Sequence, residues 1–412
     1  MLQVNKDRYS RSDLEDQYRW LEGQPLLHSP EGKMFSLCLN HPLFILSIAQ
    51  YLRERGGSLL LLRGDTPVVS ARESSQKAGC HVLIYGDDRQ MIALDGGAAQ
   101  DTPSLMQYSS GTTGEPKLIV RSWQEIQEEI VNYNRRIVTT SEEAAIILVP
   151  AHHSFGFITG MLAAVEREAL PIVITDKNPK FAIHMIRSCN KSITYGVPFL
   201  LNLLMSFKRQ PVAFDRVISS GAPMPASLLE SLNSSSNQVW SQYGCSECGC
   251  ISVGVHPETA GSVGKPLDHL RLSLEPGQTV PQEIAVFAYG RQTRTGDLGL
   301  LDEAGELLVM GRMDDLINVS GLKVIPSEVE RVIDQMPGVK ESVVFRGRHP
   351  VWGEAVKALV VTEPFLEMNE VREWCLNRLP PFKVPHSIEF RDEIPKLPSG
   401  KVSRKLLIEM ER

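Results

Sequence analysis

The chain has 412 residues, a net charge of −6, and 42% hydrophobic against 22% charged residues. This length exceeds the usual size of one hydrophobic core, so we expect at least two structural units, and the composition is typical of an ordered globular protein. The negative charge excludes a general attraction to nucleic acid or anionic membranes, so any polyanionic ligand must be bound by local groups.

The sequence carries no sign of export or membrane insertion. The first ten residues lack the basic and then apolar pattern of a signal peptide, and no apolar run is long enough to cross a bilayer. Seven cysteines, an odd number, fit a reducing compartment better than a disulfide framework. Cys245, Cys248 and Cys250 cluster, but a zinc site would need a fourth ligand at the usual spacing. We therefore expect a cytoplasmic protein with no membrane and no nucleic-acid partner.

The elements of the first 255 residues indicate an α/β fold. The first hundred residues predict only a helix at Phe44–Arg53 and a buried strand at Leu59–Leu62. From about residue 100 onward, short apolar runs alternate with helix-like segments, which is typical of a mostly parallel sheet. The predicted strands are Ala145–Val149, Pro171–Thr175, Ser192–Gly196, Arg216–Ser219 and Gln238–Gln242. Ser122 and Glu125 form a capping box for a helix that we expect to begin directly after a glycine-rich loop.

The pattern changes around Gly311–Asp315, where we place a domain boundary. The residues that follow predict a compact α+β unit, with helices and strands at Ser327–Met336, Ser342–Arg346, Ala355–Val361, Val371–Arg378 and Ser387–Phe390. The sequence therefore predicts a large α/β domain of mostly parallel sheets with helices at residues 1–311 and a small α+β domain at residues 312–412.

The strongest local signal is the loop Tyr108-Ser-Ser-Gly-Thr-Thr-Gly-Glu-Pro-Lys117. Its glycines let the backbone turn tightly beside a ligand, and its hydroxyls and lysine offer donors to phosphate oxygens. The spacing is not that of a Walker A loop, which disfavours a P-loop kinase or GTPase. On composition alone, a solvated Ser/Thr/Gly turn explains the segment equally well.

This loop resembles the phosphate loop of the adenylate-forming superfamily, which includes acyl- and aryl-CoA synthetases, peptide-synthetase adenylation domains and luciferases. Four later segments resemble further motifs of that family, in the family's order: Gln242–Glu247, Arg294–Leu298, the domain hinge at Gly311–Lys323 and the C-terminal lysine loop at Pro395–Lys401. The resemblance spans residues 108–404. It implies the adenylate-forming enzyme fold, in which a small mobile C-terminal domain rotates against the large one.

The resemblance also implies a site for ATP and Mg²⁺. The implied ATP- and AMP-binding residues are Ser109, Ser110, Gly111, Thr112, Thr113, Gly114, Lys117, Gly221, Ala222, Pro223, Tyr243, Gly244, Ser246, Asp297 and Arg312. Asp297 would accept both ribose hydroxyls, and Arg312 would add a donor. The segment at Gly221 would lie along adenine, although Ser-Gly-Ala-Pro is also an ordinary strand-ending turn. Thr113 and Glu247 would hold Mg²⁺, which prefers hard oxygen ligands.

The implied catalytic residues are Lys401, Thr113 and Glu247. A carboxylate is a poor electrophile, so its attack on the α-phosphorus needs alignment and neutralisation of developing charge. Lys401 would act in this first half-reaction, because a compact ammonium can reach both the carboxylate and the α-phosphate. Asp314 resembles the hinge residue, and Gly321 would lie along the thiol channel, where the missing side chain leaves room for pantetheine.

Substrate clues are fewer, and the sequence departs from the family pattern in places. The segment Pro150–Gly156 resembles the border of the acyl pocket, and the implied pocket residues are His153, Ser154, Phe155 and Cys245. For His153, packing under the sheet is the structural alternative. Amino-acid-activating relatives have an aspartate where this chain has Ser154, so α-amino acids are disfavoured and a neutral aryl or acyl acid fits better. Ser246 replaces a threonine, Asn318 replaces a lysine, and the chain before the phosphate loop is shorter than is usual for the family.

The sequence therefore predicts a ligase that converts a small-molecule carboxylic acid into an acyl- or aryl-adenylate and then into a thioester. Coenzyme A is our first choice of acceptor because it is the commoner one. The alternative is the phosphopantetheine of an acyl-carrier protein, since Arg346, Arg348 and Lys405 could bind the phosphate of either. A catalytically degenerate nucleotide- or carrier-binding protein is a further alternative, although the residues of the implied site are all present. A homodimer stays open.

Overall fold

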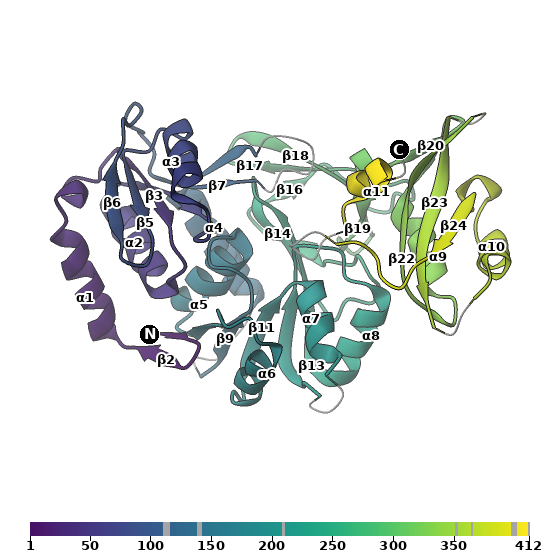
Figure 1. The fold of residues 1–412 in the computed structure, drawn as a ribbon, viewed down its shortest axis with the longest axis horizontal. Coiled ribbons are helices and arrows are strands. Elements are labelled where there is room, and N and C mark those ends of the chain that lie inside the picture. The colour runs from purple at the N-terminus through teal and green to yellow at the C-terminus, as the bar shows by residue number, and fades with distance from the viewer. Residues whose placement is uncertain are drawn as a thin grey trace.

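The structure, a computed structural model, describes residues 1–109, 116–137, 142–207, 211–350, 353–363, 366–396 and 402–410. Two large α/β layers lie side by side, and a smaller C-terminal unit lies beyond an antiparallel sheet (Figure 1). In the described ranges, no helix combines the length and the apolar character needed to span a membrane.

The N-terminal sheet follows the order β6-β5-β3-β4-β7-β8 among the described residues. Its inner strands are parallel, and β6 and β8 pair antiparallel at the two edges. The bounds are β3 Met34–Cys38, β4 Ser58–Leu62, β5 Val82–Tyr85, β6 Gln90–Ala93, β7 Ser104–Tyr108 and β8 Leu118–Ser122, with helices α1 Arg11–Glu22, α2 Pro42–Glu54 and α3 Val68–Lys77.

The central sheet follows the order β15-β14-β13-β12-β11-β9-β10-β1-β2 and is parallel from β13 to β1. Its strands are β1 Leu2–Val4, β2 Asp7–Tyr9, β9 Ala144–Ile147, β10 Leu170–Val173, β11 Ser192–Gly196, β12 Phe214–Ser219, β13 Ser236–Cys245, β14 Gly249–Val255 and β15 Lys265–Pro266. Its helices are α4 Trp123–Arg136, the π-helix η2 Phe155–Leu162, α5 Ala163–Glu166, α6 Pro179–Arg187, α7 Pro198–Met205 and α8 Ala226–Ser235. All five strands predicted in this region are confirmed, one with the predicted bounds and four with shifts at their ends.

The main hydrophobic core lies between these two sheets. Side chains of α2, α4 and η2, including Phe44, Ile130 and Phe157, pack in one cluster with inward residues of both sheets. The outer face of the central sheet is covered by α6, α7 and α8, and the outer face of the N-terminal sheet by α3. Because parallel strands here are buried on both faces, they are nearly continuous apolar runs.

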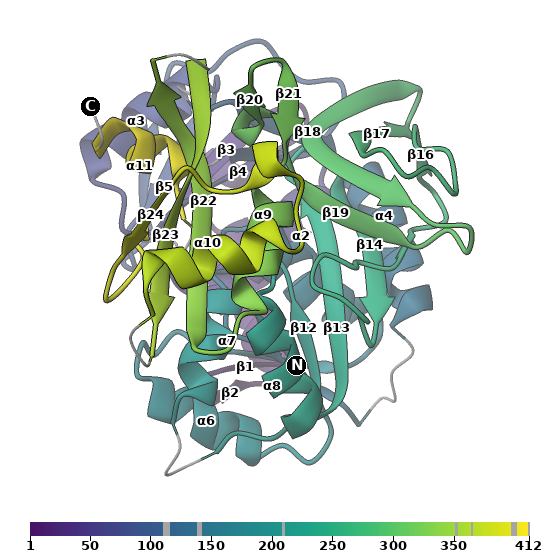
Figure 2. The ribbon, with the colours of Figure 1, turned by 90° about the vertical axis from the view of Figure 1, so that its right-hand side faces the viewer.

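Two further sheets complete the chain. An antiparallel sheet contains β16 Arg271–Leu272, β17 Gln282–Ala288, β18 Arg291–Leu301 and β19 Leu307–Arg312. The C-terminal sheet contains β20 Ile317–Val319, β21 Leu322–Val324, β22 Val339–His349, β23 Gly353–Thr362 and β24 Ser387–Phe390. Helices α9 Pro326–Asp334 and α10 Met368–Leu376 cover one face of it, and α11 Arg404–Met410 the other. Figure 2 shows α10 lying across β22 and β23.

One local prediction was wrong. The helix α4 has the predicted capping box, in which Ser122 accepts from the Glu125 N–H and the Glu125 side chain accepts from the Ser122 N–H. It does not follow the glycine-rich loop directly, because β8 lies between them and pairs antiparallel with β7. The loop therefore connects the two strands of a hairpin.

Candidate active site

A hydrogen-bonded cluster of Tyr243, Asp297 and Arg312 joins three of the predicted motifs. The antiparallel register of β18 and β19 sets Asp297 opposite Arg312, and Arg312 Nη1 donates to Asp297 Oδ1 at 2.9 Å. The Tyr243 hydroxyl, from β13 of the central sheet, donates to the other carboxylate oxygen at 2.6 Å. Arg312 Nη1 also donates to the Thr295 carbonyl at 3.0 Å. The cluster thus fixes both oxygens of one largely buried carboxylate.

The electrostatics of this cluster keep Tyr243 neutral and Arg312 charged. Burial and the neighbouring Asp297 carboxylate raise the pKa of the Tyr243 hydroxyl, so it stays a donor. Burial lowers the pKa of Arg312, but Asp297 and Asp314 raise it more, and the net change is upward. Each carboxylate oxygen has a second lone pair. Asp297 can therefore accept two more hydrogen bonds, which is what the ribose hydroxyls of a nucleotide require.

The described ends of the glycine-rich loop close a hairpin between β7 and β8. The Ser109 N–H donates to the Lys117 carbonyl at 2.8 Å, and the Lys117 N–H donates to Ser109 Oγ at 3.1 Å. Tyr108 anchors the start of the loop by donating from its hydroxyl to the Ser74 carbonyl of α3. The remaining predicted phosphate-binding residues, Ser110, Gly111, Thr112, Thr113 and Gly114, lie outside the described residues.

Glu247 lies in the tight turn between β13 and β14. The last paired residues of these strands are Cys245 and Gly249, so Ser246, Glu247 and Cys248 form the turn. The Glu247 side chain is half-buried and Gly244 is exposed.

The neighbouring β12 ends at Ser219, and Gly221, Ala222 and Pro223 follow it, so they are at the carboxyl edge of the same parallel strands. This edge is where open α/β sheets usually bind ligands.

The predicted acyl-pocket segment follows β9 and is held by Gln107 of β7. The Ser154 hydroxyl donates to Gln107 Oε1, and Gln107 Nε2 donates to the His152 carbonyl at 2.6 Å. His153 is exposed, with its ring centroid 4.3 Å from that of His152, so it is not packed under the sheet. Phe155 has its ring 5.8 Å from Tyr195.

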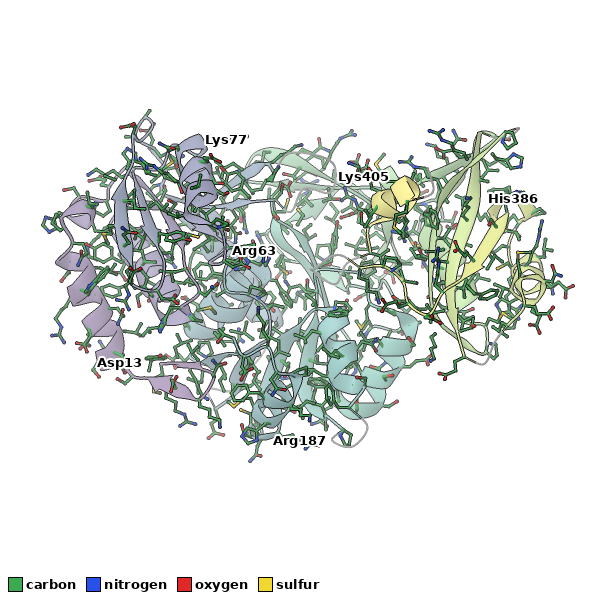
Figure 3. All side chains as sticks on the ribbon, viewed as in Figure 1. Asp13, Arg63, Lys77, Arg187, His386 and Lys405 are labelled. Atoms are coloured by element: carbon green, nitrogen blue, oxygen red, sulfur yellow. The ribbon has the colours of Figure 1, made fainter. Side chains whose placement is uncertain are left out.

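His152 is a largely buried and uncharged neighbour of this segment. Burial is the largest cause that lowers its pKa to about 3, and His153 and the Arg63 guanidinium lower it further. Arg63 lies directly after β4 and is labelled in Figure 3. His152 is therefore neutral near pH 7 and cannot balance the charge of a bound carboxylate.

The hinge segment is tied to the start of the C-terminal helix. Met313–Asp315 form one turn of 3-10 helix, and the Arg312 and Asp314 side chains are 3.5 Å apart. Arg404 of α11 donates to Asp315 at 2.9 Å, to Glu330 of α9 at 2.6 Å and to the Val344 carbonyl at 2.8 Å.

Of the residues predicted for the thiol channel and the lysine loop, Gly321 is described and Lys401 is not. Gly321 is exposed between β20 and β21, with a φ of +90° and open space around it. Lys401 lies outside the described residues. The described part of the lysine loop ends at Lys396, whose ammonium is 6.0 Å from the Phe199 ring centroid.

Sequence reasoning missed the residues that support the site from behind without being predicted to bind a substrate. Gln107 directly precedes the loop and links it to the acyl-pocket segment, and Arg121 and Glu129 form a buried ion pair behind Glu247. Gln107 could have been noticed as a polar residue in an otherwise apolar strand run. The roles carried over for the individual site residues stay predictions.

Comparison with known proteins agrees with the predicted family. A family model described as AMP-binding enzyme matches residues 53–311, and one described as AMP-binding enzyme C-terminal domain matches residues 328–401. The chain is 43% identical over 408 residues to a 3,4-dihydroxybenzoate–[aryl-carrier protein] ligase of Bacillus anthracis, covering 99% of this chain and 98% of that protein. It is 26% identical over 348 residues to a 2-succinylbenzoate–CoA ligase of Bacillus subtilis (strain 168), covering 77% and 71% of the two chains.

Solved structures agree on the fold. ATP-bound MatB from Rhodopseudomonas palustris superposes with a TM-score of 0.83 at 20% identity, covering 99% of this chain and 95% of that one. O-succinylbenzoate coenzyme A synthetase (MenE) from Bacillus subtilis, in complex with ATP and magnesium ion, has a TM-score of 0.80 at 23% identity, covering 98% and 96%. This chain belongs to the family of AMP-binding enzymes, the adenylate-forming superfamily, and is an AMP-forming ligase.

Proposed function

We propose that this ligase activates a hydroxylated aromatic acid with ATP and transfers the aryl group to the phosphopantetheine of an aryl-carrier protein. The observation that carries the proposal is the end-to-end match, at 43% identity, to a 3,4-dihydroxybenzoate–[aryl-carrier protein] ligase. It supports the carrier-protein alternative better than our first choice, coenzyme A. Coenzyme A stays the second candidate because more distant relatives are CoA ligases.

The chemistry of the acyl-pocket segment supports an acid without an amine. None of the residues from Pro150 to Gly156 is acidic, and the hydroxyl of Ser154 is bound to the Gln107 amide. A buried ammonium without a carboxylate partner is costly, so an α-amino acid fits this segment poorly. Phe155, which is partly exposed and packs against the buried Tyr195, offers aromatic surface, and the exposed His153 can hydrogen-bond a ring hydroxyl or the substrate carboxylate.

In the nucleotide site, Asp297 would accept hydrogen bonds from both ribose hydroxyls, and Arg312 would donate a hydrogen bond to the ribose or a phosphate. Tyr243 and the Gly221 segment would lie along adenine. The family's Mg²⁺ fits the donor chemistry of the Glu247 turn, because a partly exposed carboxylate is a hard oxygen ligand. Glu247 and Thr113 would hold the ion, whose charge would offset the charge that develops on the phosphates. Lys401 would stabilise the transition state of adenylation.

The proposed division of the chain is a large domain at residues 1–311 and a small one at 312–412, with Asp314 as the hinge. In support, β19 ends at Arg312 and the C-terminal sheet begins at Ile317. Rotation about the hinge would exchange the lysine loop for the thiol channel along Gly321. Arg346, Arg348 and Lys405, which is labelled in Figure 3, are exposed and can bind the phosphate of pantetheine.

The test is a comparison of acceptors with one acid. The enzyme is incubated with MgATP and 3,4-dihydroxybenzoate, and acid-dependent exchange of labelled pyrophosphate into ATP reports adenylation. Free coenzyme A, a holo aryl-carrier protein and the same carrier without pantetheine are then supplied separately. We expect exchange with this acid and a thioester on the holo carrier alone. A thioester on coenzyme A and none on the carrier would show that coenzyme A is the acceptor. Absence of pyrophosphate exchange with all of the aryl, short-chain and long-chain acids would refute the proposal.

A further inference from the structure

A buried ion pair lies directly behind the turn that carries Glu247. Arg121 of β8 and Glu129 of α4 are 2.6 Å apart, and their side chains are 4% and 1% exposed. Burial lowers the pKa of Arg121, but Glu129, together with Tyr289 and Glu125, raises it, and the net change is upward, so the guanidinium stays charged. Replacing such a pair by apolar residues is often neutral for stability. Stability alone therefore gives no reason for two charges here.

The pair supports the backbone at the start of β14. Glu129 Oε1 accepts from the Cys250 N–H at 2.8 Å. Gly249 has a φ of +73°, and a Cβ at this position would collide with both the Glu129 carboxylate and the Arg121 guanidinium. The glycine backbone thus rests on the ion pair, at a distance that no side chain would allow.

This contact supports one leg of the turn that contains Glu247. Gly249 pairs with Cys245 and Cys250 pairs with Gly244, so the backbone held by Glu129 is one leg of the turn. Arg121 belongs to β8, the strand that leaves the glycine-rich loop, and it lies four residues after Lys117. One ion pair therefore connects the strand that follows the loop to the turn that presents the Glu247 carboxylate.

We propose that Arg121 and Glu129 are positioning residues, which set the Glu247 turn against the β8 strand and thereby determine how well the site uses Mg·ATP. The inference rests on the proposed function, because it takes Glu247 as the magnesium ligand. Outer partners that orient a metal ligand change metal affinity by about 10- to 100-fold when they are removed.

A pair of matched double variants separates positioning from packing. Arg121→Met/Glu129→Gln removes both charges but keeps an acceptor for the Cys250 N–H. Arg121→Met/Glu129→Leu removes the charges and the acceptor. Both avoid an unpaired buried charge, which a single substitution would leave and which would risk unfolding.

We expect the Leu variant to raise the KM for Mg·ATP and the Mg²⁺ concentration for half-maximal pyrophosphate exchange by about tenfold. The KM for the acid should stay unchanged, and the Gln variant, which loses the ionic link to β8 but keeps an acceptor for the Cys250 N–H, should show a smaller rise than the Leu variant. Thermal unfolding of the two variants measures packing. A folded Leu variant with wild-type Mg·ATP and Mg²⁺ dependence would overturn the inference, and so would equal losses for all substrates in both variants.

Calorimetric measurement of Mg·ATP binding in the absence of the acid distinguishes failure of this inference from failure of the proposed function. If the wild type shows no exchange with any acid, the proposed function fails, while the Mg·ATP affinities of the two variants still test the positioning role. A weaker affinity for Mg·ATP in both variants, with the larger loss in the Leu variant, supports the inference, and wild-type affinity in the Leu variant refutes it.

Discussion

Substitution of Asp297 by asparagine is the most direct test of the nucleotide site. The carboxylate already binds Tyr243 through one oxygen and Arg312 through the other. One lone pair on each oxygen is then left for a ribose hydroxyl. The amide of an asparagine at this position would offer a single oxygen and no charge, and its NH₂ group would face a donor. Asp297→Asn therefore removes at least one hydrogen bond between a charged group and the nucleotide.

A hydrogen bond to a charged group contributes about 1.5–3 kcal/mol, and its loss corresponds to an affinity for ATP that is weaker by about 10- to 160-fold. Tyr243→Phe removes one donor but keeps the charge of the carboxylate, so we expect a smaller effect, below about tenfold. The measurement is the KM for Mg·ATP in pyrophosphate exchange at saturating acid, with the melting temperature as a check on folding.

Asp302→Asn is the matched control, because Asp302 is an exposed acid at the tip of the same β18–β19 hairpin. It should leave the KM for Mg·ATP unchanged. If Asp297→Asn is folded and its KM stays within about twofold of the wild type, Asp297 does not bind the ribose and the reasoning from the Tyr243 cluster is wrong.

The other predictions concern catalysis and the small unit. Lys401→Ala should lower adenylation by about 100-fold or more, while thioester formation from supplied aryl-adenylate continues; a parallel loss of both steps would contradict the two-conformation mechanism. Arg404→Met leaves two largely buried carboxylates without their shared partner, so the free energy of unfolding in denaturant should fall by about 3 kcal/mol, with little change for the exposed neighbour in Lys405→Met. Burial is the largest cause that raises the pKa of Asp334 to about 7. Between about pH 4 and pH 7 the folded form keeps a proton on Asp334 that the unfolded form releases. The wild type therefore loses the stability that this proton contributes as the pH rises through that range. Asp334→Asn should remove this loss, and equal pH dependence of the two melting temperatures would exclude it.

Elements with a local signal were predictable from the sequence. The strands Ser192–Gly196 and Ser387–Phe390 have the predicted bounds, and the capping box at Ser122 starts a helix as expected. Short apolar runs and helix caps are signals contained within a few residues. The start of the C-terminal sheet also lies close to the predicted change of pattern at Gly311–Asp315.

In the N-terminal third, the predicted helix Phe44–Arg53 and strand Leu59–Leu62 are confirmed as α2 and β4, but the strand pairing was not predictable because it is not local. The order β6-β5-β3-β4-β7 departs from chain order, and β1 pairs with β10, about 170 residues later. The β18–β19 hairpin was not predicted, since its alternation of polar and apolar residues is weak; only the motifs that contain Asp297 and Arg312 were recognised. Strand order is set by which faces can be buried together, and a single sequence does not contain that information in any one segment.

Glu129 shows which signal could have found the residues that hold the site. It is three residues after Ile126 and four before Tyr133, so helical periodicity sets it on the apolar face of α4, although it belongs to a run of glutamates. A carboxylate on a buried face requires a partner, because an unpaired buried charge is very costly. The sequence can therefore predict that Glu129 has a cationic or hydrogen-bonding neighbour. It cannot identify Arg121 or the Cys250 backbone as that neighbour, because they come from two other strands, β8 and β14, that only the fold brings together.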